Sequence, residues 1–225
     1  MLYEVVHAVV PPVWKALWRP VVEGLDNIPR TGPVIVASNH LSFADSMVIP
    51  FVTPRKVAFL AKEDYFTGTG VKGTLVRAWF EGIGMVPVDR DDTKAAVASL
   101  EIALEILARG EAFGIYPEGT RSRDGRLYRG RTGVGHLALT SGAPVVPVGL
   151  IGTEHIQPVG TTVPRLAEVT VRFGQPLTFG SVYTGVPLGR ARRQVTDVVM
   201  DAIAELSGQE RAGVYNERPA EPTPE

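Results

Sequence analysis

The sequence predicts a single α/β domain with a central, largely parallel mixed sheet flanked by helices and preceded by a short amphipathic helical segment. Short apolar runs typical of buried strands alternate with segments of helical periodicity along most of the 225 residues. Polar residues follow several of these runs directly. Because the carboxyl ends of parallel strands form the ligand crevice of such a sheet, we expect one site along that edge.

The composition is ordinary for a globular chain, with 44% hydrophobic and 21% charged residues and no interior break. The net charge of −1 excludes polyanion binding by overall charge, so any basic site must be local. The absence of cysteine excludes disulfides, thiolate metal sites and a cysteine nucleophile. No apolar run reaches the roughly 18 to 20 residues of a membrane span, and no signal peptide is apparent. We therefore expect a chain kept in the cytosol.

Residues 1–20 form the expected N-terminal segment. Helical spacing recurs on both sides of Pro11-Pro12, which predicts two short helical pieces separated by these prolines. In the second piece, Trp14 and Trp18 lie four residues apart, next to basic residues. Tryptophans beside cations favour a segment lying in a membrane interface. The alternative is a helix packed on the domain with its tryptophans in the core.

The stretch from Pro33 to Ser46 predicts a buried strand that opens into a helix. Ser42 precedes Asp45 at close to the spacing of a capping box, so the helix is expected to begin near Phe43. His40 and Asp45 can hydrogen-bond across this turn. The carboxylate would hold one ring nitrogen and leave the other free to accept a proton, as in a general base. A surface pair or a helix cap is the alternative.

A second strand is predicted at residues 57–61, and Lys62 follows it. This lysine could point into a cleft, or lie exposed at the start of a helix. Apolar residues recur with helical spacing over residues 71–81 and form a stripe of Val71, Leu75 and Trp79, with Val76 and Phe80 beside them. We expect the stripe to pack in the core, with an apolar tunnel wall or a membrane-facing patch as alternatives.

The segment from Gly84 to Arg90 predicts a strand with an arginine at its exit. A helix follows from about Thr93 to Arg109, where Gly110 ends it. Arg90 therefore lies at another strand-to-helix junction. It could bind an anion there, or form a surface ion pair with a neighbouring aspartate that would contribute little to stability.

A strand predicted at residues 112–116 runs into a basic loop. Between residues 121 and 131 the loop has one acid, Asp124, and five arginines: Arg121, Arg123, Arg126, Arg129 and Arg131. Arginines clustered with glycines at a strand end suit bidentate contacts with phosphate. Solvated surface charge is the alternative. Nucleic-acid binding is disfavoured, because the basic face is narrow and offers only Tyr128 for stacking.

The last predicted elements are a helix at residues 132–141, strands at residues 145–149 and 169–173, and a helix at residues 186–206. Together these elements give one domain over residues 21–206. Residues 207–225 are rich in Glu, Pro, Arg and Gly, and we expect them to be disordered. No metal site is predicted, because His136 and His155 lie far from His40 and show no ligand-like spacing.

Four segments, in this order, resemble the four sequence blocks of the glycerolipid acyltransferases, the family of the 1-acylglycerol-3-phosphate acyltransferases. They are Asn39-His40-Leu41-Ser42-Phe43-Ala44-Asp45, residues 84–90, Tyr116-Pro117-Glu118-Gly119-Thr120-Arg121-Ser122 and Val146-Pro147-Val148-Gly149. The first block has the NHxxxxD pattern, and the first and third blocks are the most specific. The resemblance covers roughly residues 21–175 and implies a glycerol-3-phosphate acyltransferase-like fold.

The resemblance implies an O-acyltransferase that moves a fatty acyl group from acyl-CoA or acyl carrier protein to a hydroxyl of a lysophospholipid. The expected acceptor is 1-acylglycerol-3-phosphate, which would give phosphatidate. His40, oriented by Asp45, would be the catalytic general base. No cofactor is implied beyond the acyl thioester as co-substrate, and no enzyme nucleophile is needed.

The resemblance also implies binding residues. Arg90, with Arg121 and Lys62, would hold the acceptor phosphate. Glu118 would order the third block or bind the glycerol, in a substrate site shared with its neighbours Gly119 and Thr120. The fourth block is associated with acyl-donor binding and with packing.

The chain departs from the family pattern in two places. Arg131-Thr132-Gly133 stands where the family often has a lysine in a Lys-x-Gly segment, so Arg131 is a candidate for an additional basic contact. The N-terminal segment is short relative to members with clear membrane spans. Peripheral attachment to the cytoplasmic face of the cell membrane is therefore expected.

Two alternatives stay open. The same fold and dyad could acylate another lysophospholipid or a glycolipid acceptor. The chain could also be a non-catalytic module that binds anionic lipids through the basic loop and its tryptophans. In each case the expected partners are lipids at a membrane surface, with acyl carrier protein as a candidate donor and no nucleic acid.

Overall fold

The structure, a computed structural model, describes residues 2–88, 93–158, 161, 163–180 and 183–217. Its strands are β1 (Val21–Glu23), β2 (Val34–Ser38), β3 (Val57–Lys62), β4 (Met85–Val88), β5 (Ala112–Ile115), β6 (Val145–Ile151) and β7 (Thr170–Phe173). Its α-helices are α1 (Leu2–Trp18), α2 (Asp45–Val52), α3 (Gly70–Gly82), α4 (Thr93–Ala108), α5 (Gly133–Ser141), α6 (Thr153–Ile156) and α7 (Leu188–Ser207).

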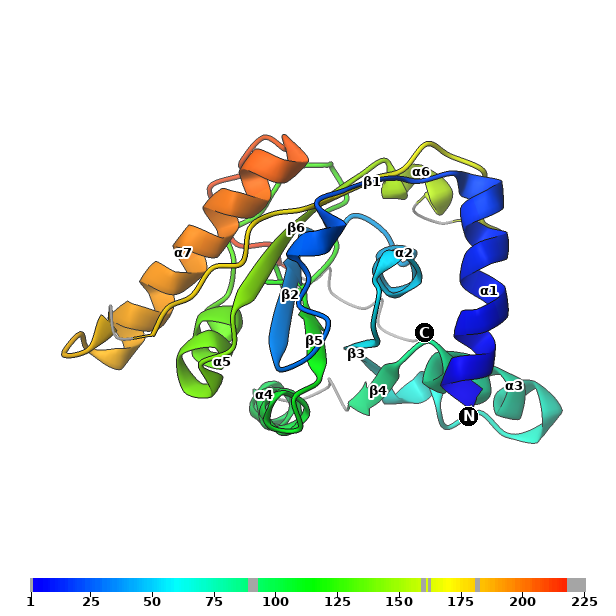
Figure 1. Cartoon of the computed structure of the whole chain (residues 1–225), viewed down its shortest axis with the longest axis horizontal. Helices are drawn as coiled ribbons and strands as arrows, with labels where there is room; N and C mark the ends of the chain where they lie inside the picture. Colours follow the sequence, from blue (N-terminus) through cyan, green and yellow to red (C-terminus); the bar gives the residue numbers. More distant parts are fainter. Residues whose placement is uncertain (1, 89–92, 159–160, 162, 181–182, 218–225) are drawn as a thin grey trace, which may run out of the picture.

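The strands form one sheet with the order β1-β7-β6-β2-β5-β3-β4. Within the described residues, neighbouring strands are parallel except β6 and β7. Helices cover both faces of this sheet (Figure 1). The predicted α/β fold with a largely parallel mixed sheet is therefore confirmed. β1 and α6 were not predicted, because elements of three and four residues are too short to show periodicity.

Strand β2 is buried on both sides of the sheet. Val34 and Val36 belong to one core cluster, together with residues of α2. Ile35 and Ala37 belong to the other, with residues of α4, α5 and α7. Because successive side chains of a strand point to opposite faces, a strand between two helical layers must be apolar throughout.

Helix α1 is continuous, so the prediction of two pieces separated by Pro11 and Pro12 is wrong. Trp14 stacks on Trp18 with ring centroids 5.8 Å apart, and lies at the same distance from Phe51 of α2. Both tryptophans are partly buried against the core. This packing offsets the preference of proline to end a helix.

Other apolar side chains of α1 and of its neighbour α3 face solvent. In α3, Phe80 is buried, but Val71 is 80% exposed and Leu75 65% exposed. The expected core packing is therefore wrong for Val71, Leu75 and Trp79, which is 37% exposed. It is confirmed for Phe80, and Val76 is partly buried against the core. In the described part of the chain, no helix is long and apolar enough to cross a membrane.

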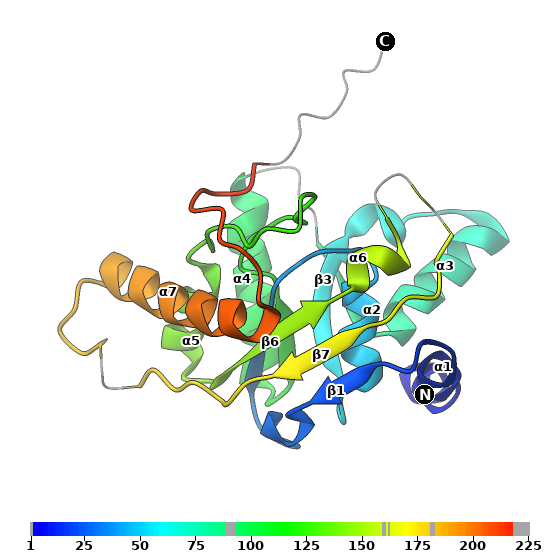
Figure 2. The same ribbon diagram turned by 90° about the horizontal axis from the view of Figure 1, so that it is seen from above.

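Residues 208–217, which we call the C-terminal arm, lie beside residues 121–131, which we call the arginine loop (Figure 2). Ala212 N donates to Leu127 O at 2.9 Å, and Leu127 N donates to Glu210 O at 2.8 Å. The predicted disorder is therefore wrong for residues 207–217, because the backbone finds hydrogen-bond partners in the loop. The remainder of the predicted disordered tail, residues 218–225, lies outside the described residues.

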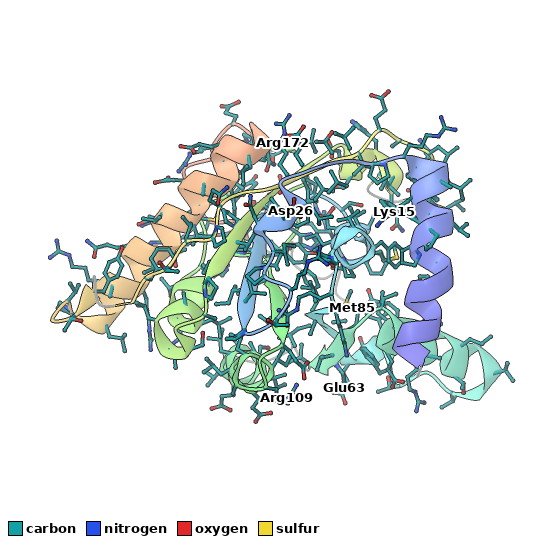
Figure 3. All side chains as sticks on the ribbon, viewed as in Figure 1. Lys15, Asp26, Glu63, Met85, Arg109 and Arg172 are labelled. Carbon is teal, nitrogen blue, oxygen red and sulfur yellow. The ribbon has the colours of Figure 1, made fainter. Side chains whose placement is uncertain are left out.

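The arm begins where the end of α7 docks on the sheet. A Cβ atom added to Gly149 of β6 would lie 2.6 Å from Leu206 C and 2.7 Å from Ser207 N. On the neighbouring strand β7, Arg172 donates to Leu206 O at 3.2 Å (Figure 3). The absence of a side chain at Gly149 thus allows the end of α7 to pack directly on β6, and Gly208, with φ of +69°, ends the helix there.

Replacing Gly149 with alanine should destabilise the fold, because the new methyl group would overlap the backbone of α7. We expect a loss of about 1–3 kcal/mol in the free energy of unfolding, measured by urea denaturation. Gly189→Ala is the matched control, since no atom of the described residues lies within 4 Å of a Cβ added in that first turn of α7. Equal stability of the two variants would show that the approach of α7 to β6 is not tight.

Candidate functional site

Three loops meet at the carboxyl ends of the parallel strands β2, β5 and β6. The loop after β2 carries His40, and Ser122 N of the loop after β5 donates to His40 O at 2.7 Å. Asn39, fully buried, binds the main chain of β6 through both ends of its amide: Nδ2 donates to Leu150 O at 2.9 Å and Oδ1 accepts from Leu150 N at 2.7 Å. The sheet edge therefore fixes the turn that holds His40.

His40 and Asp45 form the predicted pair. His40 Nδ1 lies 2.8 Å from Asp45 Oδ2, with the aspartate side chain fully buried and the histidine 15% exposed. Since an ionised carboxylate only accepts hydrogen bonds, we assign the ring proton to Nδ1. The other ring nitrogen, Nε2, is then the one that can accept a proton.

The Asp45 carboxylate also shapes the turn. The same Oδ2 accepts the backbone N–H of Leu41 at 2.7 Å and of Ser42 at 2.8 Å. Helix α2 begins at Asp45, not near Phe43 as predicted. The predicted capping box is half confirmed: Asp45 accepts the backbone N–H of Ser42 as such a box requires, but Ser42 Oγ accepts from Ala44 N instead of Asp45 N.

Tyr116, which the sequence argument did not single out, holds the histidine ring from its face. The two rings are stacked, with centroids 3.8 Å apart and planes 8° apart. The tyrosine hydroxyl hydrogen-bonds to Ser46 Oγ at 2.9 Å, and its ring stacks on Phe59 at 5.3 Å. Asp45 thus fixes the direction of the imidazole in its plane, and Tyr116 fixes the plane. Its place directly before Pro117 in the third block was the available signal.

Glu118 is fully buried between the two loops. Its Oε1 accepts His40 N at 3.0 Å and its Oε2 accepts Tyr128 N at 2.9 Å. Burial raises the pKa of this carboxyl to about 7 and outweighs the opposing effect of the two backbone hydrogen bonds, while the charges of Asp45 and Asp124 raise the pKa by a smaller amount. Of the two predicted roles, this geometry favours ordering of the loops over contact with substrate.

The residues after Glu118 form a tight turn. Gly119 has φ of +81°, and an added Cβ would lie 3.0 Å from the Arg131 side chain. Both facts favour glycine at this position. Thr120 follows in the same turn and is half-buried.

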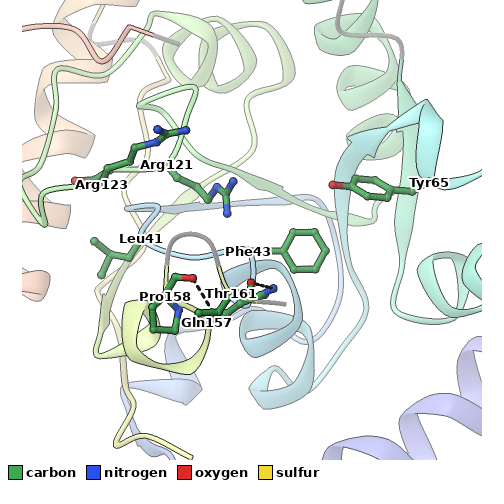
Figure 4. Close-up of a pocket in the computed structure, with 9 residues that line it drawn as sticks. Leu41, Phe43, Tyr65, Arg121, Arg123, Gln157, Pro158 and Thr161 are labelled. Atoms are coloured by element: carbon green, nitrogen blue, oxygen red, sulfur yellow. Dashed lines mark hydrogen bonds between the residues drawn. The ribbon is translucent and has the colours of Figure 1, made fainter. Parts of the chain in front are cut away.

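A pocket of about 350 Å³ opens next to the dyad, since Leu41 and Phe43 line it. Figure 4 shows Arg121 and Arg123 toward one end of this pocket and Tyr65 at the other. Ser122 and Gln157 add polar lining. Two guanidinium groups beside a general base can hold an anionic substrate next to the atom that is deprotonated.

The basic residues that were predicted to bind phosphate do not all lie at the same place in the structure. Arg121 lines the pocket, as does Arg123, which the sequence argument included only as part of the loop. Arg131 instead contacts the C-terminal arm, where its guanidinium lies 5.7 Å from the Tyr215 ring centroid. Lys62 ends β3, but its side chain, like all of Arg90, lies outside the described residues.

The arrangement of the described groups suits proton removal next to a bound negative charge. Among the described residues, no three His, Asp or Glu side chains are grouped so that they could hold a metal ion. The described groups are an oriented imidazole, two buried carboxylates that bind backbone amides, and two pocket arginines. Such a set can activate a hydroxyl group on a phosphorylated substrate.

Comparison with known proteins places this site in a family. The model of the family described as Acyltransferase matches residues 19–151, which include the dyad and the arginine loop. The chain is 32% identical over 162 residues to the chloroplastic 1-acyl-sn-glycerol-3-phosphate acyltransferase BAT2 of Brassica napus, an alignment that covers 69% of this chain and 45% of that protein. It is 29% identical over 143 residues to the 1-acyl-sn-glycerol-3-phosphate acyltransferase of Borreliella burgdorferi, covering 64% and 55% of the two proteins.

Among solved structures, the chain resembles the 1-acyl-sn-glycerophosphate acyltransferase PlsC of Thermotoga maritima. The TM-score is 0.62 at 28% sequence identity, and the match covers 90% of this chain and 82% of that one. The chain spans about half of the length of the two curated relatives named above.

The raised pKa of Glu118 makes stability depend on pH. The folded state holds a proton on this carboxyl up to about pH 7, whereas the ordinary value is 4.5, so the unfolded chain loses its proton first. The free energy of unfolding of the wild type, relative to Glu118→Gln, should therefore fall as pH rises from about 5 to 8, by on the order of 3 kcal/mol at most.

Urea denaturation of both proteins at several pH values measures this difference. The glutamine variant keeps the shape of the side chain but does not titrate, so effects of other groups cancel in the comparison. A difference that stays constant across this range, or grows with pH, would contradict the raised pKa.

Proposed function

The chain belongs to the acyltransferase family, and we propose that it transfers a fatty acyl group from an acyl thioester to the free hydroxyl of a lysophospholipid. The proposed acceptor is 1-acylglycerol-3-phosphate and the product is phosphatidate. One observation carries the proposal: His40 Nδ1 lies 2.8 Å from the buried Asp45 carboxylate, next to a pocket with two arginines. The relatives described above, which are 1-acyl-sn-glycerol-3-phosphate acyltransferases, support this choice of acceptor.

In the proposed reaction, His40 Nε2 removes the proton from the acceptor hydroxyl as its oxygen attacks the thioester carbonyl carbon. The new C–O bond gives a tetrahedral intermediate. When the intermediate collapses, the C–S bond breaks, and the proton held on the imidazolium passes to the departing thiolate. The carrier that brought the acyl group, CoA or acyl carrier protein, is thereby released with a free thiol.

Asp45 and Tyr116 support this step in different ways. Asp45 keeps the proton on Nδ1 and carries the negative charge that stabilises the imidazolium once it forms. Stacking on Tyr116 limits rotation of the ring, so that Nε2 keeps one direction. Fixing the base in this way lowers the entropy cost of reaching the transition state.

The acceptor phosphate is proposed to bind Arg121 and Arg123. Both side chains line the pocket beside Leu41 and Phe43, and a phosphate monoester carries enough charge to pair with two guanidinium groups. The family resemblance adds Arg90 and Lys62 as further phosphate contacts, and this part of the proposal rests on the sequence alone. The glycerol hydroxyl would then lie between the phosphate and His40.

We also propose peripheral attachment at the cytoplasmic face of the cell membrane. The support is a set of solvent-facing apolar side chains on the contacting helices α1 and α3: Val13, Leu17, Val71, Leu75 and Trp79. Exposed apolar side chains on neighbouring helices are typical of a surface that binds lipid. Such attachment would bring the pocket to a membrane-borne acceptor.

Replacing the base tests the function directly. Purified protein given acyl-CoA and lysophosphatidate should release free CoA, measured with a thiol reagent, and His40→Ala should lower turnover by a factor on the order of 100 or more. Asp45→Asn should lower turnover less, by at least about tenfold, because the imidazole loses its orientation and its counter-charge.

Two results would contradict this function. A His40→Ala protein as active as the wild type would remove the proposed mechanism. Salt-sensitive binding of the wild type to anionic liposomes without any release of CoA would favour the second candidate, a non-catalytic lipid-binding module that uses the arginine loop and the exposed apolar side chains.

The two pocket arginines should control affinity for the acceptor. We expect Arg121→Ala and Arg123→Ala each to raise the acceptor KM by about tenfold, since a charge-assisted hydrogen bond is lost, while the donor KM changes little. The matched control is Arg109→Ala, a surface arginine that pairs with Glu111 ahead of β5 (Figure 3). Equal increases in the KM values of donor and acceptor would argue against phosphate binding.

A further inference from the structure

The C-terminal arm contacts the site from outside the region that the family model matches, which ends at residue 151. We infer that the arm is a positioning element of the acceptor-phosphate pocket, in which Gln209 and Tyr215 hold the arginine loop in place beside the dyad. The effect of the arm on catalysis rests on the proposed function. The contacts between the arm and the loop do not depend on that function.

Gln209 connects the histidine turn to the arginine loop. Its Oε1 accepts from Asn39 Nδ2 at 2.7 Å, and its Nε2 donates to Gly125 O at 2.7 Å. Asn39 is fully buried and already bound to Leu150 on β6, so it is a fixed point. One amide, which both accepts and donates, therefore ties the loop to the turn that carries His40.

The backbone of the arm pairs with the middle of the loop. Leu127 exchanges hydrogen bonds with Glu210 and Ala212, and Arg129 N donates to Val214 O at 2.8 Å. At the near end of the loop, Asn216 Nδ2 donates to Arg121 O at 3.0 Å. The arm thus binds the loop at residues 121, 125, 127 and 129, which fixes the backbone that presents both pocket arginines.

Tyr215 holds arginines that do not line the pocket. The Arg129 guanidinium lies 5.1 Å from its ring centroid and that of Arg131 lies 5.7 Å away, both within cation–π range. Its hydroxyl accepts from Arg193 Nη1 at 3.3 Å, and Arg193 is itself held by Asp197 at 2.6 Å. Tyr215 therefore links the loop to α7.

The arginines of the loop that contact the arm are thus not those that line the pocket. Arg129 and Arg131 lie against the arm, whereas the side chains of Arg121 and Arg123 line the pocket. Ordering a flexible loop on binding costs conformational entropy. A loop that is already ordered before the acceptor arrives avoids this cost, so the affinity for the acceptor is higher. Loss of the arm contacts should therefore weaken acceptor binding and leave donor binding unchanged.

Steady-state kinetics of arm variants tests the catalytic consequence. We expect Gln209→Leu and Tyr215→Ala to raise the acceptor KM by about three- to tenfold, with the donor KM and kcat within about twofold of wild type. Tyr215→Phe should raise the acceptor KM less than Tyr215→Ala does, because the ring that faces the arginines remains and only the hydrogen bond from Arg193 is lost. Val214→Ala is the matched control, since this side chain is 58% exposed and only its backbone binds the loop.

Limited trypsin digestion supplies a readout that does not depend on activity. Trypsin cleaves after arginine, so cleavage within residues 121–131, followed by mass spectrometry, should be several-fold faster in Gln209→Leu and Tyr215→Ala than in the wild type or Val214→Ala. Faster cleavage in a protein without transferase activity would support the positioning role and reject only the proposed function.

Two outcomes would overturn the inference. In the first, cleavage rates and the acceptor KM are unchanged in both variants. In the second, kcat falls and the KM values of both substrates rise equally while the loop stays protected, which would mean that the arm acts on the fold as a whole. Tyr215 is 42% exposed, so its variants should fold even if those of Gln209 do not.

Discussion

Two buried carboxylates determine the shape of the site. The backbone N–H of His40 donates to Glu118, and those of the next two residues, Leu41 and Ser42, donate to Asp45. A chain that leaves a buried strand must find partners for its amides, and here three consecutive amides find them in side chains. The turn is therefore rigid before any substrate binds. Since burial raises the pKa of Glu118 to about 7, the two carboxylates add less negative charge near the pocket arginines than their number suggests.

Sequence reasoning worked where the structure is determined locally. The strands could be recognised because burial on both faces requires continuous apolar runs, as in Val34–Ser38. His40 and Asp45 could be paired because they lie five residues apart within one turn. Arg121 could be placed near them because parallel strands end at the same edge of a sheet.

The errors concern contacts between distant parts of the chain. Composition predicted disorder for the C-terminal residues, but their backbone pairs with a loop more than 80 positions earlier. Proline predicted a break in α1, but two tryptophans hold the helix against the core. Tyr116 could be quoted in a motif without any indication that its ring stacks on His40. None of these contacts leaves a periodic signal in the sequence.

The bond between Asn39 and Gln209 joins residues 170 positions apart. During synthesis from the N-terminus, every strand of the sheet leaves the ribosome before Gln209 does. A nascent chain can therefore assemble the sheet and the histidine turn while the arginine loop still lacks the arm that binds it. The arginine loop is held only once residues 209–216 have emerged, so a product cut before Gln209 would contain the described strands and lack the contacts that order this loop.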